Sequence, residues 1–145
     1  MKILGFDIET YREHFVFCAQ LWDGDTKTLC EKYTLTDDGT AIPAQAINKI
    51  DELFCNADYI VSFNGKRFDL PLLSRLRTQA KRTTNIPLKY MFADAQALIN
   101  YDANNNPLAS RYCAVSEWNK RHFDLLNNCL LRYSLKQWEM YQGLR

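Results

Sequence analysis

Two acids interrupt an apolar run near the start of the chain, in the order Phe6-Asp7-Ile8-Glu9-Thr10. Side chains alternate across a strand, so a strand beginning at Lys2 points Asp7 and Glu9 to one face and Phe6 and Ile8 to the other. Neighbouring carboxylates resist joint ionisation, and oxygen ligands of this kind suit Mg²⁺ or Mn²⁺. The pattern therefore indicates either a metal site at the end of a central strand or, more plainly, an exposed strand end with two solvated acids.

A second informative stretch is Phe63-Asn64-Gly65-Lys66-Arg67-Phe68-Asp69, which lies between two apolar segments. The run from Tyr59 to Val61 predicts a strand, and the run from Leu70 to Leu76 predicts a helix with Pro71 in its first turn. Asp69 is therefore expected where a loop turns into a helix. Its carboxylate is either a metal ligand or an ordinary helix N-cap.

The remaining pattern predicts an α/β fold with a mixed sheet. Strand formers at 14–22 and 28–34 flank a turn signal at Asp23-Gly24-Asp25, which gives three N-terminal strands paired antiparallel. Further along, Pro43 is expected to open a helix, residues 85–87 to form a turn, residues 91–101 a short helix, residues 122–124 a short strand and residues 125–133 a helix.

Composition restricts the kind of protein. A chain of 145 residues suits one domain, 1–145, and a net charge of +1 provides no global attraction for nucleic acid. Five cysteines without a Cys-x-x-Cys pair argue against a zinc site or a disulfide framework. The absence of a signal peptide pattern and of an apolar run of about 20 residues predicts a cytoplasmic protein that does not cross a membrane.

A basic cluster surrounds the second stretch. It consists of Lys66, Arg67, Arg75, Arg77, Lys81 and Arg82. Such residues contact phosphates in nucleic-acid-binding proteins, and they also occur on ordinary solvated helix faces. We expect phosphate contacts, with Lys66, Arg67 and Arg75 binding substrate.

Taken together, Phe-Asp-x-Glu-Thr on a first strand and Asn-x-x-x-Phe-Asp downstream resemble motifs I and II of the DEDD exonucleases. The stretch Ser62 to Pro71 is most similar to the proofreading exonuclease domain of family B DNA polymerases and its stand-alone relatives, as is His122-Phe123-Asp124-Leu125-Leu126. The resemblance covers most of the chain. It implies a ribonuclease-H-like fold and a metal-dependent 3′–5′ exonuclease that acts on single-stranded DNA or another nucleic-acid 3′ end.

The resemblance also implies roles for individual residues. Asp7, Glu9 and Asp69 would be the catalytic carboxylates that hold two Mg²⁺ or Mn²⁺ ions, with Asp7 bridging both. The terminal nucleotide would be bound by Thr10, Asn64 and Phe68. Asp124 does not match any of the family's four catalytic carboxylates, so it is not assigned to the metal site.

The chain departs from the family because no Tyr-x-x-x-Asp or His-x-x-x-x-Asp motif supplies a late fourth carboxylate. We therefore expect a C-terminally truncated domain that hydrolyses slowly or not at all. A homodimer through the resulting apolar edge is a further expectation, at Leu135, Trp138, Tyr141 and Leu144. The alternatives are a non-catalytic nucleic-acid-binding module that kept the fold and a ribonuclease of the same superfamily.

Overall fold

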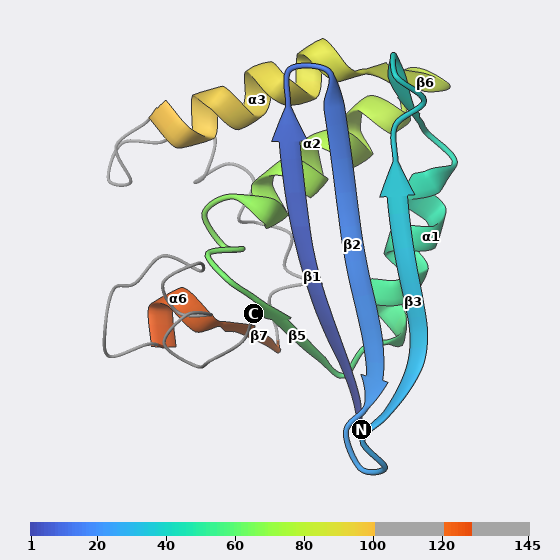
Figure 1. The fold of residues 1–145 in the computed structure, drawn as a ribbon, viewed down its shortest axis with the longest axis vertical. Coiled ribbons are helices and arrows are strands. Elements are labelled where there is room, and N and C mark those ends of the chain that lie inside the picture. The colour runs from blue at the N-terminus through green and yellow to red at the C-terminus, as the bar shows by residue number, and fades with distance from the viewer. Residues whose placement is uncertain (101–120, 129–145) are drawn as a thin grey trace.

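The computed structural model describes residues 1–100 and 121–128, which form a mixed sheet with helices packed against one face. The strand order in the five-stranded sheet is β3-β2-β1-β5-β7 (Figure 1). β1 (Lys2–Tyr11), β2 (His14–Asp23) and β3 (Thr28–Thr36) pair antiparallel, as the sequence predicts. β5 (Tyr59–Ser62) and β7 (His122–Asp124) add parallel strands on the other side of β1. The predicted α/β class with a mixed sheet is confirmed.

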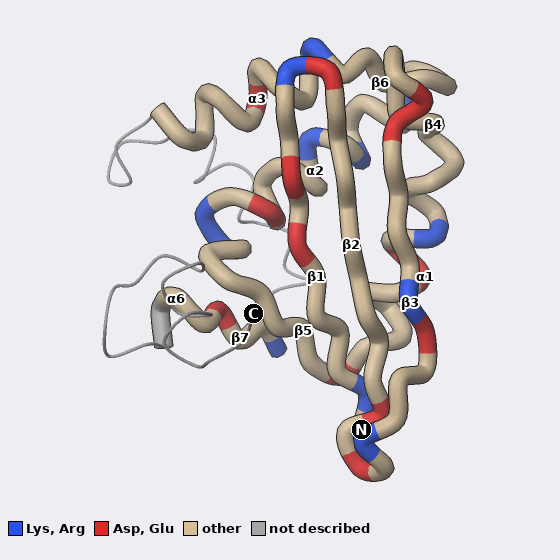
Figure 2. The backbone as a smooth tube through the Cα atoms, in the orientation of Figure 1, with Lys and Arg blue, Asp and Glu red and all other residues tan. Residues whose placement is uncertain are grey.

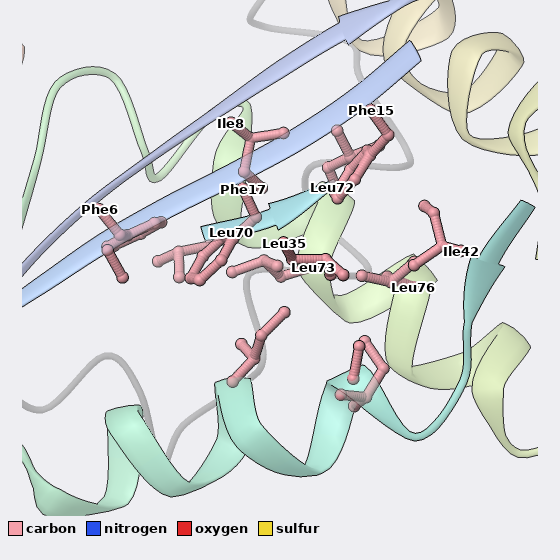
Figure 3. Close-up of a cluster of buried hydrophobic side chains, with 14 of the residues drawn as sticks. Phe6, Ile8, Phe15, Phe17, Leu35, Ile42, Leu70, Leu72, Leu73 and Leu76 are labelled. Carbon is pink, nitrogen blue, oxygen red and sulfur yellow. The ribbon is translucent and has the colours of Figure 1, made fainter. Parts of the chain in front are cut away.

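Alternation of apolar and polar residues explains why the N-terminal strands form. Leu4, Phe6 and Ile8 of β1 are buried, and Phe15 and Phe17 of β2 lie on the same face. Figure 3 shows that the side chains from the sheet gather against the leucines of α2, and the labelled sheet residues include Phe6, Ile8, Phe15 and Phe17. A period of two thus places one face of the sheet in the core and leaves Asp7 and Glu9 on the other.

Three helices cover the core face of the sheet in the described part of the chain (Figure 1). They are α1 (Ala46–Asn56), α2 (Asp69–Ala80) and α3 (Leu88–Asn100). α2 buries Leu70, Leu72, Leu73 and Leu76, which confirms the apolar stripe expected after Asp69. α6 (Leu125–Asn128) begins where a helix was predicted, and the remainder of that prediction lies outside the described residues.

The helix start predicted at Pro43 and the turn predicted at 85–87 are both wrong. β4 (Ala41–Pro43) pairs antiparallel with β6 (Asn85–Pro87) in a small second sheet, and α1 begins only at Ala46. The reason is burial, because Ile42 and Ile86 are both fully enclosed in the core and face each other across this ladder. α3 also begins earlier than predicted, at Leu88 rather than Met91.

The unequal lengths of β1 and β5 create the site. Their parallel pairing ends at Gly5 and Val61, whereas β1 continues to Tyr11. Ligand sites in α/β sheets lie beyond the carboxyl ends of parallel strands, and Asp7 and Glu9 follow directly after this last pair.

No helix within residues 1–100 and 121–128 has the length and apolar character needed to span a bilayer. The apolar edge predicted around Leu135 to Leu144 is outside the described ranges.

Candidate functional site

Asp7 and Glu9 lie on the face of β1 that faces away from the core. Both are exposed, while Phe6 and Ile8 between and beside them are buried, which confirms the predicted alternation. The Tyr11 hydroxyl lies 3.4 Å from Glu9 Oε2, within hydrogen-bond distance. In Figure 2 the acidic positions of β1 are red, and the β5–α2 loop with its blue basic positions lies beside that half of the strand.

Asp69 is the first residue of α2 and is only 3% exposed. Its Oδ1 accepts a hydrogen bond from the Ile8 backbone N–H at 3.1 Å. Because the pairing with β5 has already ended at this level of β1, the carboxylate of Asp69 takes the place of a strand partner for the Ile8 N–H. The N-cap alternative is wrong, since the cap position is Phe68 and no side chain there bonds the helix end.

The surroundings of Asp69 disfavour its charged form. Burial is the largest cause, the negative charge of Asp7 is the next, and Asp124 adds to them, so that the pKa of Asp69 rises to about 8. The Ile8 N–H opposes this rise in pKa without cancelling it. At neutral pH, without a cation, Asp69 therefore keeps its proton.

These features test whether a divalent cation fits the residues present. Asp7 and Asp69 form a pair of carboxylates from different elements whose mutual repulsion a cation would relieve. Oxygen donors of this kind match Mg²⁺ or Mn²⁺. However, no three His, Cys, Asp or Glu side chains converge as a ready metal-ligand group among the residues that the structure describes. The pair fits a cation, and Glu9 shares only the strand face of Asp7.

The loop between β5 and α2 has an unusual backbone held by a distant carboxylate. Asn64 adopts the left-handed conformation with φ of 62°. Its N–H donates to Asp124 Oδ1 at 2.9 Å, and the Lys66 N–H donates to Asp124 Oδ2 at 3.0 Å. Asp124 is 1% exposed and also accepts the Leu126 N–H at 3.2 Å. Sequence reasoning missed this role, although an acid inside an apolar stretch already signals a buried partner.

A second contact joins β7 to the end of β5, just before this loop. His122 Nε2 lies 2.6 Å from Ser62 Oγ. Burial lowers the pKa of His122, which favours the neutral ring in the fold. A Cβ added at Gly65 would collide with the side chain of Ser62, so the start of the loop packs closely against the end of β5.

The remaining predicted substrate residues have varied surroundings. Lys66 and Arg67 are exposed on the loop, and Thr10 and Asn64 are half-buried. Phe68 is also half-buried and packs against the core. Arg75 makes a two-pronged ion pair with Asp94 of α3, with Nε at 2.9 Å and Nη2 at 3.2 Å from the carboxylate oxygens. Its predicted contact with phosphate stays a prediction.

The surroundings of two more cationic residues, Arg77 and Lys32, can be compared with those of Arg75. Arg77 of α2 forms an ion pair with Asp51 of α1, as Arg75 does with Asp94. Lys32 of β3 and Asp7 of β1 both line a hollow of ≈ 280 Å³ on the open face of the sheet. The hollow thus brings a basic side chain to the face that carries the acids of β1.

The mixed sheet, with helices on its core face and acids where β1 outruns its parallel neighbour, defines a ribonuclease-H-like domain. Residues 4–142 match the family model of the RNase_H superfamily, and the chain belongs to this superfamily. Its members are generally hydrolytic nucleases that commonly use divalent metals. No curated protein and no solved structure shows significant similarity to the chain.

Proposed function

We propose that this protein is a metal-dependent 3′–5′ exonuclease that removes nucleotides from nucleic-acid 3′ ends. The observation that carries the proposal is the pair formed by exposed Asp7 and buried Asp69, in which burial and the charge of Asp7 raise the pKa of Asp69 to about 8. A fold gains nothing from such a pair by itself, because burial and repulsion both cost stability. Membership of a superfamily of hydrolytic nucleases supports the same conclusion.

In this proposal the acids of β1 and α2 hold Mg²⁺ or Mn²⁺, with Asp7 and Asp69 at the centre and Glu9 at the open side. Divalent cations bound there supply Lewis-acid chemistry for attack of water on a phosphodiester. Ile8 fixes the Asp69 carboxylate through its N–H, so that the carboxylate is aligned before any ligand arrives. This preorganisation removes a reorientation cost from the reaction.

The β5–α2 loop and its neighbours bind the substrate in this proposal. Thr10 and Asn64 offer hydrogen bonds to the terminal nucleotide, and the exposed half of Phe68 offers a surface for its base. Lys66 and Arg67 are exposed beside the acids and contact the phosphates that follow. Single-stranded DNA is the substrate that we propose to test first.

A second candidate is a nucleic-acid-binding module without hydrolytic activity. One observation favours it, namely that no three metal-ligating side chains converge in the described parts of the chain. Such a module would keep the basic loop and lose only the chemistry.

The test is a gel assay of 5′-labelled single-stranded DNA with Mn²⁺. We expect a ladder shortened from the 3′ end, with Asp7→Ala inactive and a parallel RNA substrate reporting the sugar preference. Oligonucleotide binding without cleavage would favour the binding module. Cleavage that persists in Asp7→Ala would refute the assigned site.

A further inference from the structure

We infer that Asp124 is a positioning residue, which holds the β5–α2 loop in the shape that presents Asn64 to a 3′-terminal nucleotide. The inference rests on the proposed function for the identity of the ligand. The conclusion that Asp124 fixes the loop backbone rests on the structure alone. Asp124 holds Asn64 and Lys66 by their backbone N–H groups, so its effect on the site passes through the loop backbone.

The first step is the geometry of the carboxylate. Each of its oxygens accepts a loop N–H, from Asn64 at 2.9 Å and from Lys66 at 3.0 Å. Two donors two residues apart can both reach one carboxylate only when the chain curls around it. A side chain with one acceptor and one donor at this place would turn an N–H₂ group toward a backbone N–H.

The second step is the backbone conformation of this loop. Asn64 has φ of 62°, in the left-handed region that asparagine enters more readily than most residues with a Cβ. The loop carbonyls of Asn64 and Gly65 in turn accept N–H groups of Phe68 and Leu70 at the start of α2. The carboxylate therefore fixes the loop at Asn64 and Lys66, and the loop carbonyls satisfy N–H groups of the first turn of α2.

The third step is that β7 contacts both the loop and the end of the strand that leads into it. Besides Asp124, His122 contacts Ser62 at 2.6 Å, and Ser62 lies directly under Gly65. Among the described strands β7 pairs only with β5, so its side chains act on β5 and on the loop that follows it. Asp69 has an independent tie to β1 through Ile8, which separates metal binding from loop shape.

The experiment compares Asp124→Asn with Asp37→Asn in the full chain. Asp37 is a matched control because it is also a buried carboxylate that accepts two backbone N–H groups, from Phe15 and Gly39, in a different loop. The first readout is amide hydrogen exchange by NMR. We expect Asn64 and Lys66 to be protected in the wild type and to exchange at least about tenfold faster in Asp124→Asn only, the scale of one lost hydrogen bond.

The second readout is affinity for a 5′-fluorescein oligothymidine with Ca²⁺ in place of the reactive metal. Asp124→Asn should weaken this binding about tenfold, while Mn²⁺ affinity by calorimetry stays within about threefold, because loop and acids are held separately. With active protein, the same change should raise KM more than it lowers kcat.

The outcomes separate the two proposals. Rapid exchange of Asn64 and Lys66 in the wild type would overturn the hold without any variant, even if Asp124→Asn fails to fold. Equal losses of oligothymidine affinity in Asp124→Asn and Asp37→Asn would overturn positioning in favour of general destabilisation. A wild type that binds no oligonucleotide would overturn the proposed function and the substrate role of the loop, while the exchange rates would still decide the hold.

Discussion

Two almost completely buried aspartates differ in their surroundings, Asp69 at the start of α2 and Asp124 at the end of β7. Asp69 is 3% exposed and receives one N–H from another residue, that of Ile8. Asp124 is 1% exposed and receives three, from Asn64, Lys66 and Leu126. Burial is nearly the same in the two cases, so the difference lies in how many lone pairs the protein satisfies.

That difference separates a candidate metal ligand, Asp69, from a carboxylate that stabilises the fold, Asp124. A carboxylate has about four lone-pair sites, and three donors leave Asp124 little capacity for a cation. Asp69 retains more of its capacity and faces the negative charge of Asp7. A buried acid that its own fold leaves less satisfied is a candidate for binding, whereas a fully hydrogen-bonded one stabilises the fold.

The largest expected effect is on the pH dependence of stability. Burial and the charge of Asp7 raise the pKa of Asp69 from 3.8 to about 8, so between these values the unfolded chain binds fewer protons than the folded chain. Asp69 therefore contributes a fall in the free energy of unfolding as pH rises through this window, by about 1.4 kcal/mol for each pH unit. Asp69→Asn should remove this pH-dependent fall in the free energy of unfolding. Urea denaturation at a series of pH values, with EDTA present, measures it.

The same measurement on Asp124→Asn sharpens the contrast. Asparagine has one acceptor oxygen, so at least one of the three N–H groups loses its acceptor, which should lower stability by about 1.5–3 kcal/mol at both ends of the pH window. Asp69→Asn should instead be more stable than the wild type at pH 8. Equal pH slopes in the wild type and Asp69→Asn would contradict the assignment of the raised pKa.

The next largest effect is on catalysis. If Asp69 and Asp7 hold the cation, Asp69→Asn and Asp7→Ala should each reduce Mn²⁺-dependent cleavage by at least about a hundredfold, the scale expected when reacting groups are misplaced. Glu13→Ala is a control that removes an exposed acid just past the same strand. Asp124→Asn should lose less activity than Asp69→Asn, and the reverse order would exchange the roles assigned to the two residues.

A smaller effect is expected from packing at Gly65, between the two aspartates. A Cβ added there would lie 2.7 Å from Ser62 Cβ and closer still to its hydroxyl. Gly65→Ala should therefore cost about 1–3 kcal/mol, as overpacking does in other cores. Gly5→Ala is the matched control, because a Cβ at Gly5 meets nothing within 4 Å. Chemical denaturation of both variants measures the difference in stability. Equal stabilities would show that the loop backbone shifts to accommodate the added methyl group.

The sequence was sufficient where the evidence is local. Alternation in β1 predicts the common face of Asp7 and Glu9, and the leucine spacing after Asp69 predicts α2. Both patterns repeat within one element, so they do not depend on the rest of the fold.

It was insufficient where contacts join distant segments. β4 and β6 are short and end in proline, so their local patterns indicate a helix start and a turn although the two strands pair with each other. The hydrogen bond from Ile8 to Asp69 depends on where β5 stops relative to β1. The role of Asp124 depends on the path of a loop that precedes it by a whole region of the chain. None of these relations has a signature in the spacing of residues.

The smallest effect concerns the basic residues, and it tests whether ion pairing removes a cation from the nucleic-acid surface. Affinity for single strands changes with salt by a slope of about 0.7 per phosphate contact. Replacing Lys66 and Arg67 with Ala should therefore flatten the slope by about 1.4. Arg75→Ala should change the slope by less than the value of about 0.7 expected for one phosphate contact, because two hydrogen bonds hold its guanidinium on Asp94.

Asp94→Ala makes the opposite change, because it removes the ion-pair partner of Arg75 and keeps the arginine. Releasing the guanidinium should steepen the slope, since an unpaired arginine becomes available to phosphate. Fluorescence anisotropy of a labelled oligothymidine between about 50 and 200 mM salt covers the range in which such slopes are measured. If Arg75→Ala flattens the slope as much as the loop variants do, Arg75 binds phosphate despite its partner. In that case a side chain that is already ion-paired still takes part in binding. The rule inferred from Asp69 and Asp124, that well-paired groups stabilise the fold and less-paired ones bind ligands, then does not apply to basic side chains.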